Sequence, residues 1–444
     1  MKSQLLRRLL LPVVGLLYVS TLQAETLTLR QAYLLAEDND PQWAAAKNTY
    51  SANQQVVDLN RSGVLPQIGL QGSYSESNVD YEDLGDDSFD SHSYSASVRQ
   101  PLFDLESWHT YQLGKALDNQ YSAEFQNTRE DFLLRVLTLY LDVLRADANV
   151  TFRQAEQEAI DRQLEQSKQR FEVGLVAITD VHEAQAAYDT AVSARIAAES
   201  DLFVALRQLE TVTGVQVDDV VNLSPELPIL PPEPADLDTW IKGALERNAS
   251  LQAANFAVNA AEQNYKSQRG RHAPTLDLVG THSYTSTGAP TSIGTEQPDT
   301  TRDVISLELA MPLYSGGGIS ASRRQSHYQF LATQDQQRLA RRATIQDTTS
   351  FYQLTVANVA QVKARNQSTV SARVALEATQ AGYEAGTRTI VDVLNVQRNL
   401  FQNERDYTNA RFDYVLNSLR LKRAAGVLTA EELLTLNQWM AKQP

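Results

Sequence analysis

The sequence contains no cysteine, which excludes disulfides, thiolate metal ligands, a cysteine nucleophile and a cysteine-linked lipid anchor at the N-terminus. Its six histidines are scattered without the H-x-x-H or H-E-x-x-H spacing of a catalytic zinc site. The glycine-rich nucleotide-binding motifs and the G-x-S-x-G serine motif are also missing. We therefore expect no metal, no cofactor and no catalysis.

Positive charge is scarce as well. The 444 residues include 39 Lys+Arg against 54 Asp+Glu, which gives a formal net charge of −15. A protein that binds nucleic acid needs a basic face to neutralise phosphates. The charge balance therefore argues against nucleic acid as a partner.

The first 24 residues have the order of an export signal. Lys2, Arg7 and Arg8 precede the apolar run Leu9–Leu17, and Ala24 supplies a small residue at the cleavage point. The apolar run is too short for a membrane anchor, which needs about 20 residues. No later segment resembles a membrane helix. We expect this signal peptide (1–24) to be removed and any membrane span of the mature chain to be β-structure.

The rest of the chain is duplicated. A shift of 212 residues aligns Phe171–Gly174 with Tyr383–Gly386, and Asp180 with Asp392. The two copies meet at a stretch that holds five of the 14 prolines, a composition that favours an extended connector. We therefore divide the mature chain into a first repeat (25–224), a connector (225–236) and a second repeat with a C-terminal segment (237–444).

Each repeat is predicted to place a moderate helix before two strands and a very long helix after them. The moderate helices are expected near 29–62 and 237–269. Two stretches without Gly or Pro, 115–173 and 319–381, predict rods of roughly 90 Å. A Gly-containing turn then leads into a further helix. Apolar residues at helical spacing form narrow packing stripes, namely Leu133, Leu137, Tyr140 and Leu144 in the first repeat and Leu400, Tyr407, Tyr414 and Leu421 in the second.

Four segments alternate apolar and polar residues as outer-membrane barrel strands do. One pair follows Pro66 and the other follows Pro274, with polar loops predicted at Asp80–Asp90 and Thr285–Asp303. An ordinary half-buried soluble sheet is the alternative. The junctions to the long helices contain Pro101 and Pro312, which we expect to act as swivels between sheet and helix.

Four strands cannot close a barrel, and lipid does not tolerate an open sheet edge, so several chains must pool their strands. Two chains give eight strands, whose interior is filled by side chains. Three give twelve, which leave room for water. A conducting pore therefore favours a trimer.

The turns Phe171–Val181 and Tyr383–Leu394, together with the proline junctions, resemble those of the TolC family of outer-membrane efflux proteins. The resemblance covers essentially the whole mature chain and implies an α+β membrane fold. In that fold, a homotrimer forms a 12-stranded β-barrel with four strands per chain. The β-barrel is continuous with a long periplasmic α-helical barrel, surrounded by a mixed equatorial domain that includes the C-terminal segment. The resemblance also implies that the protein is located in the outer membrane of a Gram-negative bacterium.

The same resemblance implies a passive exit duct of tripartite efflux pumps and type I secretion systems, exporting drugs, toxic compounds and in some members proteins. The expected partners are a periplasmic adaptor (membrane fusion) protein, an inner-membrane transporter of the RND, ABC or MFS class, and outer-membrane lipid. A periplasmic coiled-coil scaffold or adaptor-like protein without a pore is the alternative function, and an exported enzyme is a second one.

The resemblance also assigns site residues. Asp392 matches an acidic ring at the periplasmic entrance constriction, where three like charges favour a raised carboxyl pKa. Asn395 stands where close relatives carry a second acidic ring. The pairs that match links holding the entrance closed are Arg388 with Asp180 and Tyr383 with Thr179. The residues that match adaptor-contacting tips are Phe171, Val173, Gly174, Leu175, Ala385, Gly386 and Thr387.

Each assignment has a plainer interpretation. Asp392 is also compatible with an N-cap of the final long helix. Arg388 and Asp180 are compatible with ordinary solvated charges. Gly174 and Gly386 are compatible with simple helix-hairpin turns that contact no partner.

Overall fold

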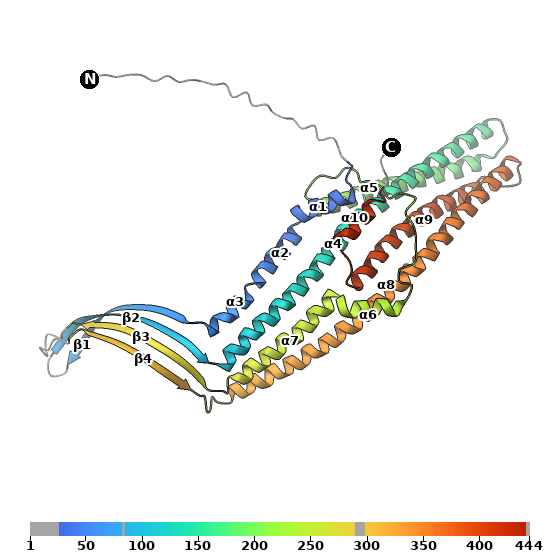
Figure 1. Ribbon diagram of the computed structural model, residues 1–444. Helices are drawn as coiled ribbons and strands as arrows, with labels where there is room; N and C mark the ends of the chain where they lie inside the picture. The colour runs from blue at the N-terminus through green and yellow to red at the C-terminus, as the bar shows by residue number, and fades with distance from the viewer. Residues whose placement is uncertain (1–25, 82–84, 289–297, 441–444) are drawn as a thin grey trace, which may run out of the picture.

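The structure, a computed structural model, describes residues 26–81, 85–288 and 298–440. The predicted signal peptide therefore lies outside the described residues. A curved sheet forms one end of the elongated molecule, long helices continue from it, and two helix hairpins form the other end (Figure 1).

Two helices are far longer than the rest, and each folds back into a second helix. Helix α4 (Leu105–Glu172) has 68 residues and α8 (Gly318–Glu384) has 67. They turn into α5 (Ile178–Thr213) and α9 (Ile390–Ala424) respectively. The two predicted rods are thus confirmed. Among the described residues, none of the helices combines the length and apolar character needed to cross a membrane.

Helix α4 begins ten residues before the predicted rod because Gly114 does not interrupt it. The glycine faces α3 closely enough that a Cβ there would lie 2.8 Å from Cβ of Asn60. The helix starts instead after its N-cap Asp104, whose carboxylate accepts hydrogen bonds from the backbone N–H groups of Glu106 (2.9 Å) and Ser107 (3.2 Å).

Both moderate helices are interrupted, so the prediction of continuous helices was wrong. The first is divided into α1 (Leu29–Asn39), α2 (Pro41–Asn53) and α3 (Val56–Arg61), with a short 3₁₀ turn η1 (Ser62–Val64) after them. Proline at position 41 lacks the N–H that a continuing helix requires, and it stands instead at the first position of α2, where that loss is harmless.

The second moderate helix is divided into α6 (Leu237–Arg247) and α7 (Ala249–Gly270). Asn248 separates them because its side chain accepts a hydrogen bond from the N–H of Leu251 at 2.9 Å and so begins a new helix. A last helix, α10 (Ala430–Asn437), follows α9.

The four strands form one antiparallel sheet in the order β1-β2-β3-β4. Their bounds are β1 (Gln67–Tyr81), β2 (Gly85–Phe103), β3 (Thr275–Thr287) and β4 (Thr300–Ala310). The predicted loops were too long, because backbone pairing continues into polar sequence, with Asp80 opposite Asp86 and Thr285 opposite Thr300. Part of the second loop, residues 289–297, lies outside the described residues.

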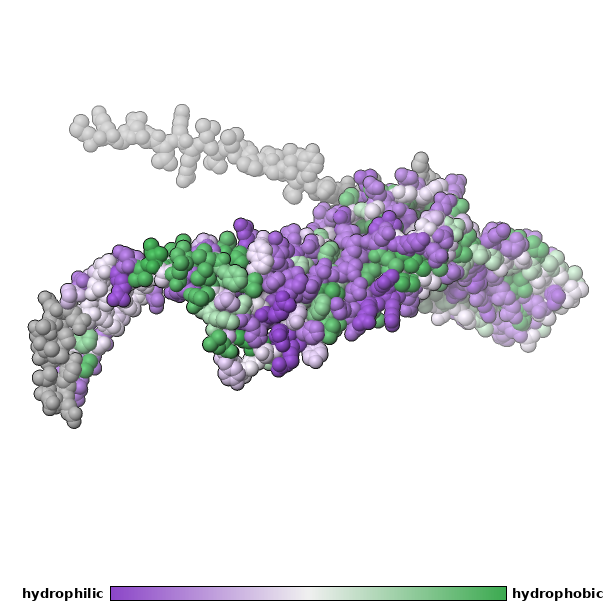
Figure 2. All heavy atoms as spheres, turned by 60° about the horizontal axis from the view of Figure 1, so that its bottom comes forward, coloured by the Kyte–Doolittle hydropathy of each residue, from purple (hydrophilic) through white to green (hydrophobic). Residues whose placement is uncertain are grey.

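The register gives the sheet one apolar and one polar face. Ile68 pairs with Val98, and Leu278 with Leu307, on the apolar face; further toward the tip, Tyr94 stacks on Tyr284 with ring centroids 5.1 Å apart. Apolar side chains cover the sheet where it adjoins the helices (Figure 2). The opposite face carries serine pairs joined by hydrogen bonds, Ser73 with Ser93 (2.8 Å) and Ser75 with Ser91 (2.7 Å).

The main hydrophobic core lies near the middle of α4, where α1, α5, α9 and α10 meet it (Figure 1). The predicted stripe Leu133, Leu137, Tyr140 and Leu144 is confirmed, since all four side chains are buried. In the predicted stripe of α9, Leu400 and Leu421 are buried, whereas Tyr407 and Tyr414 are half-buried.

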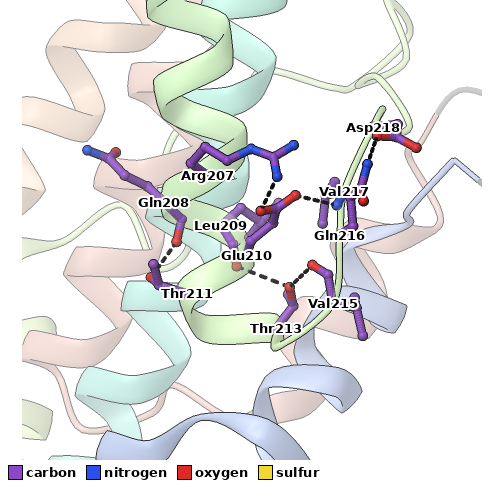
Figure 3. Close-up of polar contacts among 10 residues, drawn as sticks. All are labelled: Arg207, Gln208, Leu209, Glu210, Thr211, Thr213, Val215, Gln216, Val217 and Asp218. Carbon is purple, nitrogen blue, oxygen red and sulfur yellow. Dashed lines mark hydrogen bonds and ion pairs between the residues drawn. The ribbon is translucent and has the colours of Figure 1, made fainter.

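Glu210, near the end of α5, directs the chain toward this core (Figure 3). One carboxylate oxygen accepts from the N–H of Val217 at 2.8 Å, and the other accepts from Nη1 of Arg207 at 2.6 Å. The chain then reaches Val220, which forms a parallel bridge with Leu27 beside α1. One ion-paired side chain thus fixes the path from a helix hairpin to the central core.

The proline-rich segment 225–236 crosses α9 without forming helix or strand. Tyr414 of α9 holds it, because its hydroxyl donates to the carbonyl of Leu230 (2.9 Å) and accepts from the N–H of the same residue (3.1 Å).

We predict that Tyr140→Phe destabilises the protein by about 1–3 kcal/mol. The fully buried hydroxyl donates to the carbonyls of Val221 (2.7 Å) and Leu27 (3.0 Å). Its loss removes the donor of the Val221 carbonyl, whereas the Leu27 carbonyl still accepts from the N–H of Val221 at 3.0 Å. Denaturant unfolding of the detergent-purified protein measures the change. Tyr314→Phe, at a side chain 87% exposed, is the control. Equal midpoints for both variants contradict the prediction.

Candidate functional site at the ends of the two helix hairpins

The turn between α4 and α5 is a Schellman motif. Gly174 has φ of 74°, its N–H donates to the carbonyl of Phe171 at 2.9 Å, and the N–H of Leu175 donates to that of Arg170 at 2.8 Å. An added Cβ at Gly174 meets no atom within 4 Å, so the positive φ, rather than lack of space, requires glycine.

The turn between α8 and α9 repeats the same motif. Gly386 has φ of 75°, and its N–H donates to the carbonyl of Tyr383 at 3.1 Å. The N–H of Thr387 donates to the carbonyl of Gly382 at 2.8 Å. Position 386 is also open, with nothing within 4 Å of an added Cβ. Both interhelix turns are therefore rigid in backbone and free on their outer side.

The structure brings all seven predicted adaptor-contact residues to these two turns, and α9 packs against both α4 and α5. On the first turn three apolar side chains point into solvent, with Phe171 42%, Val173 69% and Leu175 73% exposed. On the second turn the exposed residues are small or polar: Ala385, Gly386 and Thr387. The α4–α5 turn thus presents an apolar surface to solvent, and the α8–α9 turn presents a polar one.

Asp392 lies in the first turn of α9 and belongs to a capping box. Thr389 is the N-cap, and its hydroxyl accepts from the N–H of Asp392 at 3.2 Å. The carboxylate in turn accepts from the N–H of Thr389 at 3.0 Å and from its hydroxyl at 2.9 Å. The interpretation of Asp392 as the N-cap was therefore wrong: Thr389 is the N-cap, and Asp392 stands at the third helical position as its capping-box partner.

These bonds set the charge state of Asp392. The backbone N–H of Thr389, then its hydroxyl and the nearby Arg388, hold the pKa of the Asp392 carboxyl below its usual range. The carboxyl is thus ionised at neutral pH. A ring of three such charges acts in the opposite direction. Asn395 lies one turn further along α9 and is exposed.

Arg388 and Asp180 are not joined within one chain, where no ion pair between them occurs among the described residues. The stem of Arg388 instead covers Gly382, where a Cβ would lie 2.8 Å from Cγ of the arginine. The carboxylate of Asp180 accepts from the hydroxyl of Thr179 at 3.4 Å. Their role in closing the entrance stays a prediction.

Tyr383 packs into a small core formed with Ile160, Ile390 and Val393, and it forms no hydrogen bond to Thr179 among the described residues. Its side chain is 6% exposed, and the guanidinium of Arg170 lies 4.8 Å from its ring centroid. Its hydroxyl is buried without a hydrogen-bond partner among the described residues. The sequence analysis missed this second core. Its signal is the pair Ile390 and Val393, which are three residues apart in the first turn of α9 and therefore share one face of the helix.

The two predicted swivel prolines occupy different positions. Pro101 lies inside β2, where the pairing with β3 becomes irregular between residues 101 and 103. Such an irregularity is one of the few sheet positions that accept proline. Pro312 lies after the end of β4, in the link to α8.

The model of the family described as "Outer membrane efflux protein" matches residues 32–215 and 240–427. The chain belongs to this family. It is 33% identical to Outer membrane protein TolC of Escherichia coli, over 98% of this chain and 90% of that protein. It is 29% identical to the alkaline protease secretion protein AprF of Pseudomonas aeruginosa, over 92% of this chain and 86% of that protein. The predicted role as an outer-membrane channel for efflux and secretion is thereby confirmed.

The fold class is confirmed by a solved structure. The outer membrane protein VceC from Vibrio cholerae superposes with a TM-score of 0.77, at 18% identity, over 90% of this chain and 96% of that one. The strands and long helices of this chain therefore have the arrangement seen in VceC. The family and the similarity to TolC locate the chain in the outer membrane.

We predict that Tyr383→Phe leaves the unfolding midpoint unchanged or raises it, because the variant keeps the ring and removes an unpartnered buried hydroxyl. Tyr383→Ala should lower stability by about 3–5 kcal/mol, since the ring fills the second core. Denaturant unfolding compares both variants with the wild type. A clear loss of stability in Tyr383→Phe would reveal a partner for the hydroxyl in the assembled protein, as the Thr179 link requires.

Proposed function

We propose that three copies of this chain form a passive exit duct, in which the sheets make a 12-stranded barrel in the outer membrane and the long helices make a periplasmic tube. The observation that carries the proposal is the sheet. Its outer strands β1 and β4 bear highly exposed apolar side chains, among them Ile68 (80%), Leu70 (83%) and Ile305 (85%). Such a sheet needs lipid on one face and neighbouring strands at both edges.

Joining β1 of one chain to β4 of the next satisfies both needs. The apolar face then contacts lipid, with Tyr94 and Tyr284 at the level of an interfacial aromatic girdle. The serine-rich face then lines a wet lumen. A periplasmic scaffold without a pore has no use for this sheet.

We also infer that residues 1–24 direct export and are then removed.

We propose that the hairpin ends dock on a periplasmic adaptor that connects the duct to an inner-membrane transporter of the RND, ABC or MFS class. The exposed Phe171, Val173 and Leu175 support this, because apolar side chains on a rigid turn need cover from a partner. Efflux of drugs and toxic compounds and secretion of proteins are both proposed. The relatives TolC and AprF support this pair of roles, since AprF is named for protease secretion.

Recording in planar lipid bilayers tests the duct directly. The purified, detergent-extracted protein should give single-channel steps, because a closed ring of strands leaves a water-filled path. A scaffold should leave the bilayer silent. Absence of channel steps from protein that is trimeric by size would overturn the proposal.

We predict that Arg388→Ser raises the mean conductance. Among the described residues, Arg388 is exposed at the hairpin end and forms no ion pair within its own chain, although its charge lies near Asp392. We propose that it meets Asp180 of a neighbouring protomer and holds the entrance closed. Arg338→Ser removes an equal charge from the body of α8 and should leave conductance unchanged. An unaltered conductance in Arg388→Ser would remove this residue from the latch.

We predict that Asp392→Asn weakens block of the channel by divalent and trivalent cations by about tenfold or more, since three charges leave the entrance at once. Asparagine keeps an oxygen that can accept from the N–H of Thr389, so the helix cap is preserved. Asp335→Asn on α8 is the charge-matched control. Equal block in both variants would place Asp392 away from the constriction.

A further inference from the structure

A cavity of about 190 Å³ lies between α4 and α9. Along both helices it falls between the main core and the second core. Helix α4 lines it with Asn149, Phe152, Arg153 and Glu156, and α9 lines it with Arg398, Phe401, Gln402 and Arg405. On each helix these side chains follow the spacing i, i+3, i+4, i+7, so a single stripe of each helix faces the cavity. The space equals the volume of roughly six water molecules.

The cavity is cationic within a chain of net charge −15. Three arginines line it against one acid, Glu156, which is 5% exposed and accepts from Nη1 of Arg153 at 2.7 Å. That ion pair neutralises the charge of Glu156 and holds the side chain of Arg153 in place. Among the described residues, the guanidiniums of Arg398 and Arg405 keep most of their donors free.

Arg398 makes no ion pair among the described residues, and it is exposed at the rim. Among the described residues, Arg405 forms an ion pair only with its chain neighbour Asp406, at 3.3 Å. Asp406 also accepts from Arg365 at 3.2 Å. Adding these residues to the cavity gives four arginines against two acids. The local excess of positive charge is therefore not neutralised by the chain itself.

We propose that this cavity binds a small multivalent oxyanion, of the phosphate or polycarboxylate class, between Arg398 and Arg405. Guanidinium groups bind such oxygens in paired, charge-assisted hydrogen bonds. The amides of Asn149 and Gln402 supply further donors, and the rings of Phe152 and Phe401 limit the access of water. The volume holds inorganic phosphate with a few waters, or one citrate.

The bound anion joins the α4–α5 hairpin to the α8–α9 hairpin, because α9 supplies the two arginines and α4 supplies the amide of Asn149. Binding therefore stabilises the arrangement in which α4 and α9 lie together. The inference depends on the geometry within one chain and is independent of whether the protein conducts.

Isothermal titration calorimetry on the detergent-purified full-length protein, in buffer of low ionic strength, tests the proposal with inorganic phosphate and, separately, with citrate. We expect saturable binding of at least one of them, with one site per chain. Arg398→Gln combined with Arg405→Gln should raise the dissociation constant by about tenfold or more. The single variant Arg398→Gln, at an exposed side chain, guards against a folding defect and should show a smaller weakening.

Arg338→Gln combined with Arg341→Gln on α8 removes the same charge outside the cavity and should bind as the wild type does. Absence of saturable binding of both anions overturns the proposal, and so does an unchanged affinity in the cavity variants. A channel that conducts normally but binds neither anion would refute this inference alone and leave the proposed duct intact.

Discussion

The structure depends on one constraint, that backbone hydrogen-bonding groups removed from water must find partners. A sheet of four strands leaves the outer sides of β1 and β4 without partners among the described residues, and the same strands expose Ile68 and Ile305 almost fully. Lipid can cover the apolar face, but only other strands can satisfy the edges. The isolated chain is therefore one part of a larger ring, and the curvature of its sheet fits that role (Figure 1).

The helices obey the same constraint differently, because each satisfies its own backbone. What they lack is a broad apolar face: α4 is deeply buried mainly around Leu137 and Tyr140, where other helices surround it. A tube that carries water needs such helices, since each must pack sideways and still present polar groups to the lumen. The arginine-lined cavity between α4 and α9 shows that this lateral packing is incomplete even within one chain.

Several elements were predictable from sequence because their signals are local. Long stretches without Gly or Pro gave α4 and α8, and period-two alternation gave the strands. The breaks at Pro41 and Asn248 carried equally local signals, a proline at a first helical position and a capping side chain, yet the prediction carried one helix through each of them. The ends of β1 and β2 were not predictable, since their aspartates and serines are poor strand formers that pairing nevertheless retains.

The sequence by itself determined the two repeats, their long helices, the alternation of the strands and the glycine turns, because spacing and backbone preference decide each of these locally. Only the tertiary structure decided which residues meet. It placed Tyr383 in a second core next to Arg170, kept Arg388 apart from Asp180, and gathered three arginines around one cavity. These outcomes depend on the rotation and offset of helices packed side by side, which no single stretch of sequence specifies.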